Sequence, residues 1–267
     1  MPFDLTQRVV LVTGASSGIG AAVATEAARR GATVGICARR GARLARVLEE
    51  CRGGAPDSRM WVVDLADPEQ VDRLASEAEE AFGRIDVLVN NAGIPKRRLV
   101  TALTADEVDQ VMLVNYRAPV RLSLALLPGM LRRRQGHIIN VSSVAAVLSS
   151  PGEAAYNASK AALTVFTETA AVDLWATGVG VHLIHPGVVE TGLFDLPDND
   201  DLANPVDPIP VDEAARAVLG ALDTGRLTTY IPDYFEDLAK EKANDVEGFI
   251  AGMAAWVQAE RNSEELA

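Results

Sequence analysis

Cysteine and histidine are scarce in this 267-residue chain, which has two cysteines and three histidines. Cys37 and Cys51 lack the CxxC spacing of a zinc site, and one cysteine pair is not a disulfide framework. His137, His182 and His185 are also poorly spaced for metal ligation. The sequence therefore predicts no bound metal.

Long hydrophobic runs and an excess of basic residues are absent as well. The most apolar stretch, VRLSLALLPGML, is interrupted by Pro128 and Gly129, and the N-terminal residues lack the features of a secretory signal. The chain has 25 Lys and Arg against 37 Asp and Glu, a formal charge of -12 that disfavours phosphate backbones. We expect a cytoplasmic protein that binds neither membranes nor nucleic acids.

Short apolar runs alternate along the chain with segments of helical periodicity. Strands are predicted at residues 9–13, 33–37, 60–63, 85–90, 137–141, 179–184 and 228–231. Helices are predicted at residues 19–30, 41–51, 68–82, 104–117, 119–134, 154–177 and 212–224. Nearly continuous apolar strands are typical of a parallel sheet buried on both faces. We therefore expect an α/β fold in which residues 1–267 form one domain, a doubly wound parallel sheet of the Rossmann type with helices on both faces.

Two segments depart from this alternation. Residues 190–210 are rich in proline and aspartate and predict a long loop, which we interpret as a substrate lid. Residues 234–260 carry apolar side chains at helical spacing and predict a C-terminal helix. This helix either docks on the body of the protein or serves as a subunit contact or substrate cap.

The segment TGASSGIG follows the first predicted strand and opens the first predicted helix. Gly14 lets the chain leave the strand, Gly18 permits a pyrophosphate to approach, and Gly20 allows close packing of helix and strand. The helix N-terminus offers N–H groups to phosphates, and Ser16 and Ser17 add hydroxyl donors. This turn predicts a dinucleotide site.

The end of the second strand bears on the choice of dinucleotide. A cofactor with a free ribose 2′-hydroxyl calls for an acidic residue there, but the chain has Ala38, Arg39 and Arg40. A guanidinium can bind a 2′-phosphate through two hydrogen bonds. The sequence therefore favours NADP(H) over NAD(H), with a merely solvated arginine pair as the alternative.

Tyr156 and Lys160 are four residues apart on a predicted helix, so their side chains lie on one face. A free phenol has a pKa of about 10, and a nearby cation lowers it, here Lys160 acting together with the charge of a bound cofactor. The pair therefore predicts a tyrosine that exchanges protons near neutral pH. A solvated tyrosine and lysine on a helix surface is the alternative.

Several motifs occur together in a characteristic order. They are TGASSGIG, then Asn90-Asn91-Ala92-Gly93, Asn115, Ser143, Tyr156-x-x-x-Lys160, and Pro186-Gly187 with Thr191. In this order the chain resembles the classical short-chain dehydrogenase/reductase family over roughly residues 7–232. One departure is Ser17, where many NADP-using members have a basic residue, so Arg39 with Arg40 is left to hold a 2′-phosphate.

The resemblance implies roles for individual residues. Tyr156 is expected to be the general acid and base, Lys160 to lower its pKa and bind the nicotinamide ribose, Ser143 to hold the substrate oxygen, and Asn115 to fix a water. Further cofactor contacts are implied at Ile19, Asp64, Leu65, Asn91, Ala92, Gly93, Pro186, Gly187, Val189 and Thr191.

We therefore expect an NADP(H)-dependent oxidoreductase that moves a hydride between a nicotinamide and a carbonyl or secondary alcohol. The apolar residues of segments 144–152 and 190–210 suggest a small hydrophobic substrate. The resemblance also implies a homodimer or homotetramer built on the helices near 104–134 and 154–177. A non-catalytic dinucleotide-binding regulator on the same fold is the alternative. A sugar-nucleotide epimerase is disfavoured, because the glycine-rich turn of such epimerases has TGxxGxxG spacing, whereas this chain has TGASSGIG.

Overall fold

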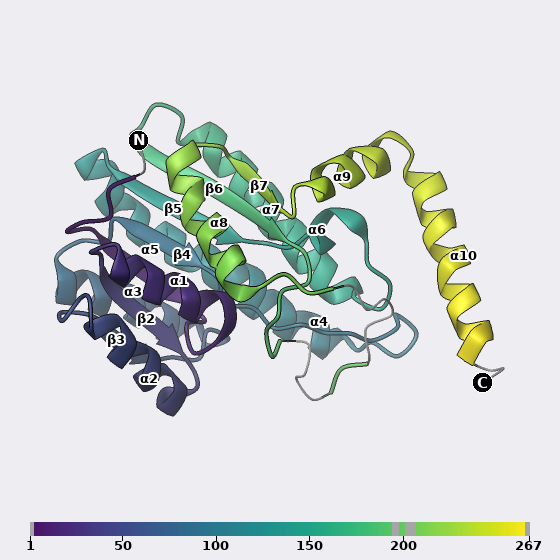
Figure 1. Ribbon diagram of the computed structural model, residues 1–267, viewed down its shortest axis with the longest axis horizontal. Helices are drawn as coiled ribbons and strands as arrows, with labels where there is room; N and C mark the ends of the chain where they lie inside the picture. The colour runs from purple at the N-terminus through teal and green to yellow at the C-terminus, as the bar shows by residue number, and fades with distance from the viewer. Residues whose placement is uncertain (1–2, 194–197, 201–206, 265–267) are drawn as a thin grey trace.

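Seven parallel strands form a sheet in the order β3-β2-β1-β4-β5-β6-β7 in the computed structural model (Figure 1). The structure describes residues 3–193, 198–200 and 207–264. The strands are β1 (Val9–Thr13), β2 (Thr33–Ala38), β3 (Arg59–Val62), β4 (Val87–Asn90), β5 (Gly136–Val141), β6 (Val179–Pro186) and β7 (Thr228–Ile231). The order reverses between β1 and β4, which is where doubly wound sheets bind ligands. The predicted fold class is confirmed.

Helices cover both faces of the sheet because successive strand residues point to opposite sides. Val10 and Val12 of β1 belong to the core beneath α1 (Gly18–Arg29), α2 (Gly41–Arg52) and α8 (Val211–Thr224). Leu11 belongs to the core on the other face. That face is covered by α3 (Pro68–Phe82), α5 (Ala118–Arg133) and α7 (Ala154–Asp173).

The segment predicted as one helix over 104–117 is divided in the structure. α4 (Ala105–Met112) ends early, and the chain continues as a π-helical turn, η1 (Leu113–Arg117), before α5. π-helical turns are often found at functional sites. A short helix that the sequence did not predict, α6 (Ala145–Leu148), follows β5.

The C-terminal segment is also divided, into α9 (Tyr234–Asn244) and α10 (Val246–Glu264), rather than forming the one helix predicted over 234–260. The backbone of Asp245 leaves the helical conformation, with φ at -143° and ψ at 80°. Its side chain accepts a hydrogen bond of 2.8 Å from the N–H of Gly248, as an N-capping aspartate does. Figure 1 shows α10 standing away from the sheet and its flanking helices.

The loop predicted over 190–210 is described only in part, since residues 194–197 and 201–206 lie outside the described residues. Its two ends come together, because the N–H of Ile209 donates to Val188 and the N–H of Glu190 donates to Ile209. Within the described part of the chain, no helix is both long and apolar enough to cross a membrane.

Half-buried His137 of β5 stacks on buried His182 of the neighbouring strand β6. The Nδ1 atom of His137 lies 3.1 Å from the Nε2 atom of His182. Burial lowers the pKa of His137 to about 4, with further lowering by His182 and Arg8 and an opposing effect of Asp86. Burial also lowers the pKa of His182. Both rings are therefore neutral in the folded protein near pH 7.

We predict that this pair makes the protein less stable in mild acid. The unfolded chain takes up these protons near pH 6.5, whereas folded His137 does so only near pH 4, so stability is lost as the pH falls through this window. Between pH 7 and 5 the free energy of unfolding should drop by about 2 kcal/mol on this account. Urea denaturation should show a shallower drop in His137→Gln, and an equal drop would contradict the prediction.

Candidate active site

The carboxyl ends of β1 to β6 surround a cavity of about 490 Å³ at the point where the strand order reverses. All but two of the site residues predicted from the sequence line this cavity. The exceptions are Gly20 and Asn115, which lie behind its wall. The structure thus brings together motifs that are spread over most of the chain.

The glycine-rich turn makes close backbone contacts that side chains would block. Gly14 has φ at 68°, and a Cβ there would lie 2.7 Å from the Cα of Ala92. Gly18 has φ at 57°, and a Cβ there would lie 2.8 Å from the Cγ2 of Thr191. A Cβ on Gly20 would collide with the side chain of Asn91, so Gly20 serves packing rather than the cavity wall.

The N-terminus of α1 faces the cavity with the properties of an anion site. Its N-cap residue, Ser17, makes no side-chain capping bond, and the first turn has no acidic residue. Free N–H groups and the positive end of the helix dipole are therefore available to a phosphate. A pyrophosphate fits this cradle, because Gly14 and Gly18 place no side chain beside the free N–H groups.

Two arginines follow β2, but they are placed differently. Arg40 lies against the turn, where its Nη2 atom donates to Ser16 Oγ at 2.9 Å and to Ser17 Oγ at 2.5 Å. Both arginines are exposed and line the cavity, and Arg39 lies beside Ala38. Arg40 is thus positioned by the turn, which leaves Arg39 accessible to a bound group.

Residues after β3 and β4 line the neighbouring wall. Asp64 and Leu65 follow β3, and Asp64 Oδ1 accepts a hydrogen bond of 3.0 Å from the N–H of Ala66. After β4, the N–H groups of Asn91 and Ala92 both donate to the Thr13 hydroxyl at 3.0 Å. These bonds tie the segment after β4 to the end of β1.

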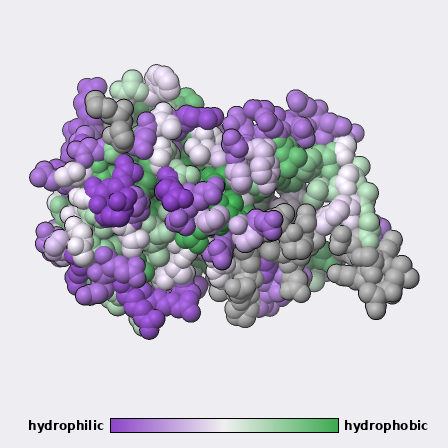
Figure 2. Space-filling model, in the orientation of Figure 1, coloured by the Kyte–Doolittle hydropathy of each residue, from purple (hydrophilic) through white to green (hydrophobic). Residues whose placement is uncertain are grey.

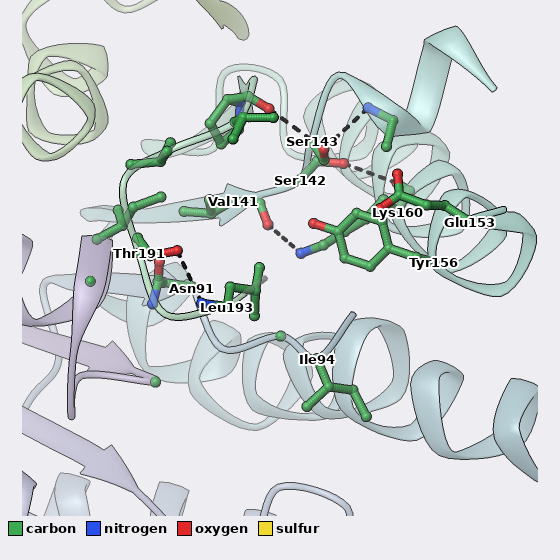
Figure 3. Close-up of a pocket in the computed structure, with 18 of the residues that line it drawn as sticks. Asn91, Ile94, Val141, Ser142, Ser143, Glu153, Tyr156, Lys160, Thr191 and Leu193 are labelled. Carbon is green, nitrogen blue, oxygen red and sulfur yellow. Dashed lines mark hydrogen bonds between the residues drawn. The ribbon is translucent and has the colours of Figure 1, made fainter. Parts of the chain in front are cut away.

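Tyr156, Lys160 and Ser143 meet at the other end of the cavity (Figure 3). The Nζ atom of Lys160 donates to the carbonyl oxygen of Val141 at 2.8 Å and lies 5.8 Å from the centre of the Tyr156 ring. Figure 3 shows the Tyr156 hydroxyl and the Lys160 amine on the same side of the cavity. Ser143 Oγ accepts from the N–H of Ala145 at 3.1 Å, which orients this hydroxyl.

The charges at this end are governed by burial. Burial raises the pKa of the Tyr156 phenol, the negative charge of Glu153 raises it further, and a hydrogen bond with Ser143 lowers it. Burial lowers the pKa of Lys160 to about 8. Among the described side chains, burial and Glu153 thus raise the pKa of Tyr156, whereas the lowering that the sequence predicts from Lys160 together with the charge of a bound cofactor stays a prediction. The phenol is protonated at neutral pH.

Asn115 holds the segment after β4 in place. Its Oδ1 atom accepts from the N–H of Ile94 at 2.8 Å, and its Nδ2 atom donates to the Ile94 carbonyl at 2.9 Å and to Ser159 Oγ at 3.0 Å. The segment passes close to Lys160, since a Cβ on Gly93 would be 3.4 Å from both Asn115 Oδ1 and Lys160 Nζ. The π-helical turn η1 carries Asn115 into this position.

Four of the cofactor-contacting residues predicted from the sequence lie at the end of β6 and just beyond it: Pro186, Gly187, Val189 and Thr191. Pro186 is the last residue of β6, and its carbonyl oxygen accepts from the N–H of Val144 at 3.0 Å. Gly187 donates to the carbonyl of Ile231 at 2.8 Å, and Val189 bridges to the segment that returns from 207. The four predicted residues Pro186, Gly187, Val189 and Thr191 all line the cavity.

Some lining residues were not singled out by the sequence. Glu153 is 7% exposed and lies one helical turn before Tyr156, where no motif marks it. His185 does not line the cavity: it is 1% exposed, stacks on Tyr230 and contacts the carbonyl of Ser143 at 2.8 Å, so it is a packed residue. Side chains of α9 and α10 also line the cavity, and their only sequence signal was helical spacing.

Metal ligands do not gather in the part of the protein that the structure describes. Among those residues there is no group of three or more histidine, cysteine, aspartate or glutamate side chains able to hold an ion. Cys37 and Cys51 are free and buried.

The curated proteins that are similar to this chain include dehydrogenases and reductases. Dehydrogenase/reductase SDR family member 7B of Mus musculus is 33% identical over 264 residues, which cover 95% of this chain and 77% of that protein. A fatty acyl-CoA reductase of Mycobacterium tuberculosis is 40% identical over 197 residues, covering 72% of this chain and 67% of that protein.

Solved structures share the fold over nearly the whole chain. A short-chain dehydrogenase/reductase from Burkholderia phymatum in complex with NAD has a TM-score of 0.83 at 28% identity, covering 92% of this chain and 96% of that one. A short-chain dehydrogenase from Sphingobium yanoikuyae in complex with NADPH has a TM-score of 0.80 at 28% identity, covering 91% and 95%.

The family model described as short chain dehydrogenase matches residues 8–200. This match covers most of the chain and spans the glycine-rich turn as well as Tyr156 and Lys160. The chain therefore belongs to the short-chain dehydrogenase/reductase family, and it is an oxidoreductase that acts on CH–OH or C=O groups with a nicotinamide dinucleotide.

Proposed function

We propose that this enzyme prefers NADP(H) to NAD(H) and interconverts a carbonyl and a secondary alcohol on a small apolar molecule, with Tyr156 as general acid and base. One observation carries the proposal: Tyr156, Lys160 and Ser143 meet at one end of a cavity whose other end is the glycine-rich turn. A dinucleotide lying along this cavity places its nicotinamide beside the three side chains.

The proton chemistry follows from the charges at the site. A bound nicotinamide supplies the hydride to the carbonyl carbon. The Tyr156 phenol, whose pKa is raised by burial, keeps its proton at neutral pH and can give it to the carbonyl oxygen. The Ser143 hydroxyl donates a hydrogen bond to the same oxygen while negative charge develops. Tyr156 is left as a phenolate, which the nearby Lys160 ammonium stabilises.

Lys160 is suited to pass on the next proton. Its pKa of about 8 lies close to neutral pH, so the amine exchanges its proton more readily than an exposed lysine. Asn115 supports this step by holding Gly93 and Ile94 beside the Lys160 amine. In this role Asn115 is a positioning residue.

We assign the remaining predicted residues to different parts of the dinucleotide, according to their place along the cavity. At the phosphates we assign Gly14, Ser16, Ser17, Gly18 and Ile19, and at the adenosine Asp64, Leu65, Asn91, Ala92 and Gly93. At the nicotinamide we assign Pro186, Gly187, Val189 and Thr191. Arg39 is assigned to the 2′-phosphate, because it is exposed at the end of β2 where no acidic residue repels that group.

We predict that Tyr156→Phe lowers kcat by about a hundredfold or more, because the general acid is lost while ring packing is kept. NADPH oxidation over a panel of aldehydes and ketones gives kcat, and fluorescence titration gives the Kd for NADPH. The Kd should change by less than about threefold, since the phenol is not needed for phosphate binding. Retained turnover in this variant would rule out the assigned role.

The cofactor assignment is tested by the double substitution Ala38→Asp with Arg39→Ser. We expect the ratio of kcat/KM for NADPH to that for NADH to fall by about tenfold or more, because one charge-assisted contact is lost and a repulsive carboxylate is added. Arg43→Ser serves as the matched control, since Arg43 is exposed on α2 and does not line the cavity. An unchanged ratio in the double variant would contradict the assignment.

A homodimer or homotetramer is supported by apolar side chains left on the surface. Val165 and Val172 of α7 are 60% and 73% exposed, Leu124 of α5 is 57% exposed, and Trp175 lies just beyond α7. A subunit contact would remove these exposed apolar side chains from water. We assign the contact to α5 and α7.

Val165→Glu should therefore shift the protein to a smaller species, because a buried unpaired carboxylate destabilises the contact. Light scattering after size-exclusion chromatography measures the mass. Val246→Glu on α10 is the control, because this valine is also exposed but lies far along the chain from α5 and α7. Equal masses for wild type and Val165→Glu would argue against the contact.

A further inference from the structure

An apolar stripe runs along α10 without being used by the protein core. Phe249, Met253 and Trp256 recur at intervals of four and three residues, so they lie on one side of the helix. All three line the cavity that contains Tyr156. No side chain of residues 246–259 is buried, so the stripe does not serve to pack α10 against the body.

The helix before the stripe is held firmly to the body. The Nζ atom of Lys242 in α9 donates to the carbonyl oxygen of Val147 and to the hydroxyl of Ser149, each at 2.6 Å. The ring of Phe235 lies so close to Gly187 that a Cβ there would be 2.6 Å from it. These contacts seat α9 at the end of β6 and beside α6, and α10 extends from there along the cavity.

Apolar residues from the body line the same cavity. Ile94, Leu148 and Leu193 line the cavity from three different segments, and Leu238 of α9 joins them. In Figure 2, hydrophobic surface gathers where α9 meets the rest of the protein. The cavity is therefore lined by apolar side chains from the body as well as from α9 and α10.

One cavity contains both Tyr156 and the stripe of α10, and this indicates what kind of molecule can bind along the stripe. The same cavity contains Tyr156 and Ser143 at one point and Trp256 at another. A molecule whose carbonyl lies at Tyr156 can therefore extend towards the stripe without leaving the cavity. Contact with hydrocarbon removes the stripe from water, which is favourable for both partners.

We infer that the stripe of α10 binds the hydrocarbon tail of the substrate, so that the enzyme acts on carbonyl compounds or secondary alcohols with a long aliphatic chain. This inference rests on the function proposed above, and it adds the class of substrate. Phe249, Met253 and Trp256 are specificity-determining residues in this assignment.

The test compares methyl ketones from butanone to dodecanone in NADPH oxidation. For the wild type, kcat/KM should rise by about two- to fourfold for each added methylene group, as burial of hydrocarbon predicts. Trp256→Ala and Met253→Ala should each lower kcat/KM for dodecanone by about tenfold or more and change that for butanone by less than about twofold. Neither residue is buried in the core, so the variants should fold.

Ile250→Ala is the matched control. Ile250 is an apolar residue of the same helix, but it is 44% exposed and does not line the cavity. It should leave both ketones unaffected. Equal effects of Trp256→Ala on both ketones, or no effect on either, would overturn the inference. It is also overturned if Trp256→Ala dissociates an oligomer and leaves the chain-length profile unchanged, because the stripe then covers a second copy.

A binding measurement distinguishes failure of the proposed reaction from failure of the inference about the stripe. If no ketone of any length is reduced, the proposed reaction fails, and Trp256 emission still tests the stripe. In a background of Trp61→Phe and Trp175→Phe, Trp256 is the remaining tryptophan of the chain. Saturable change of its emission with dodecanone, but not with butanone, supports the inference, and the absence of such a change overturns it.

Discussion

Close contact between the ends of β1 and β4 is the constraint on which the rest of the site depends. The Thr13 hydroxyl accepts hydrogen bonds from Asn91 and Ala92, and Gly14 lets the two backbones touch. Beyond this contact the chain leads into α1 on one face of the sheet and towards η1 on the other. The two connections diverge, and the crevice between them is where a dinucleotide can lie.

Burial then decides the charges of the groups at the end of this crevice. Removing water from Tyr156 and Lys160 disfavours the ionised form of each, so the pKa of the phenol rises and that of the amine falls. Glu153 adds to the effect on Tyr156. A phenol that keeps its proton beside an amine that readily releases one is an arrangement suited to proton delivery.

Elements with local signals could be predicted closely. The helix over 68–82 begins after Asp67, whose side chain caps it, and ends before Gly83, whose φ is 75°. The division at Asp245 has a local signal of the same kind, the side-chain cap to Gly248, but the helical spacing over 234–260 conceals it. The π-helical turn at Asn115 was not predictable in this way. Asn115 is held by Ile94 and Ser159, which lie 21 and 44 residues away, and such partners have no local signature.

The sequence by itself determined the alternation of strands and helices, the glycine-rich turn and the spacing of Tyr156 and Lys160. These features depend on steric limits and hydrogen bonds among residues that are close along the chain. The tertiary structure alone decided the direction of the pKa shift at Tyr156, the place of Glu153 beside it and the side of α10 that faces the cavity. Burial and charge depend on segments that meet only in the folded protein, so no local pattern could specify them.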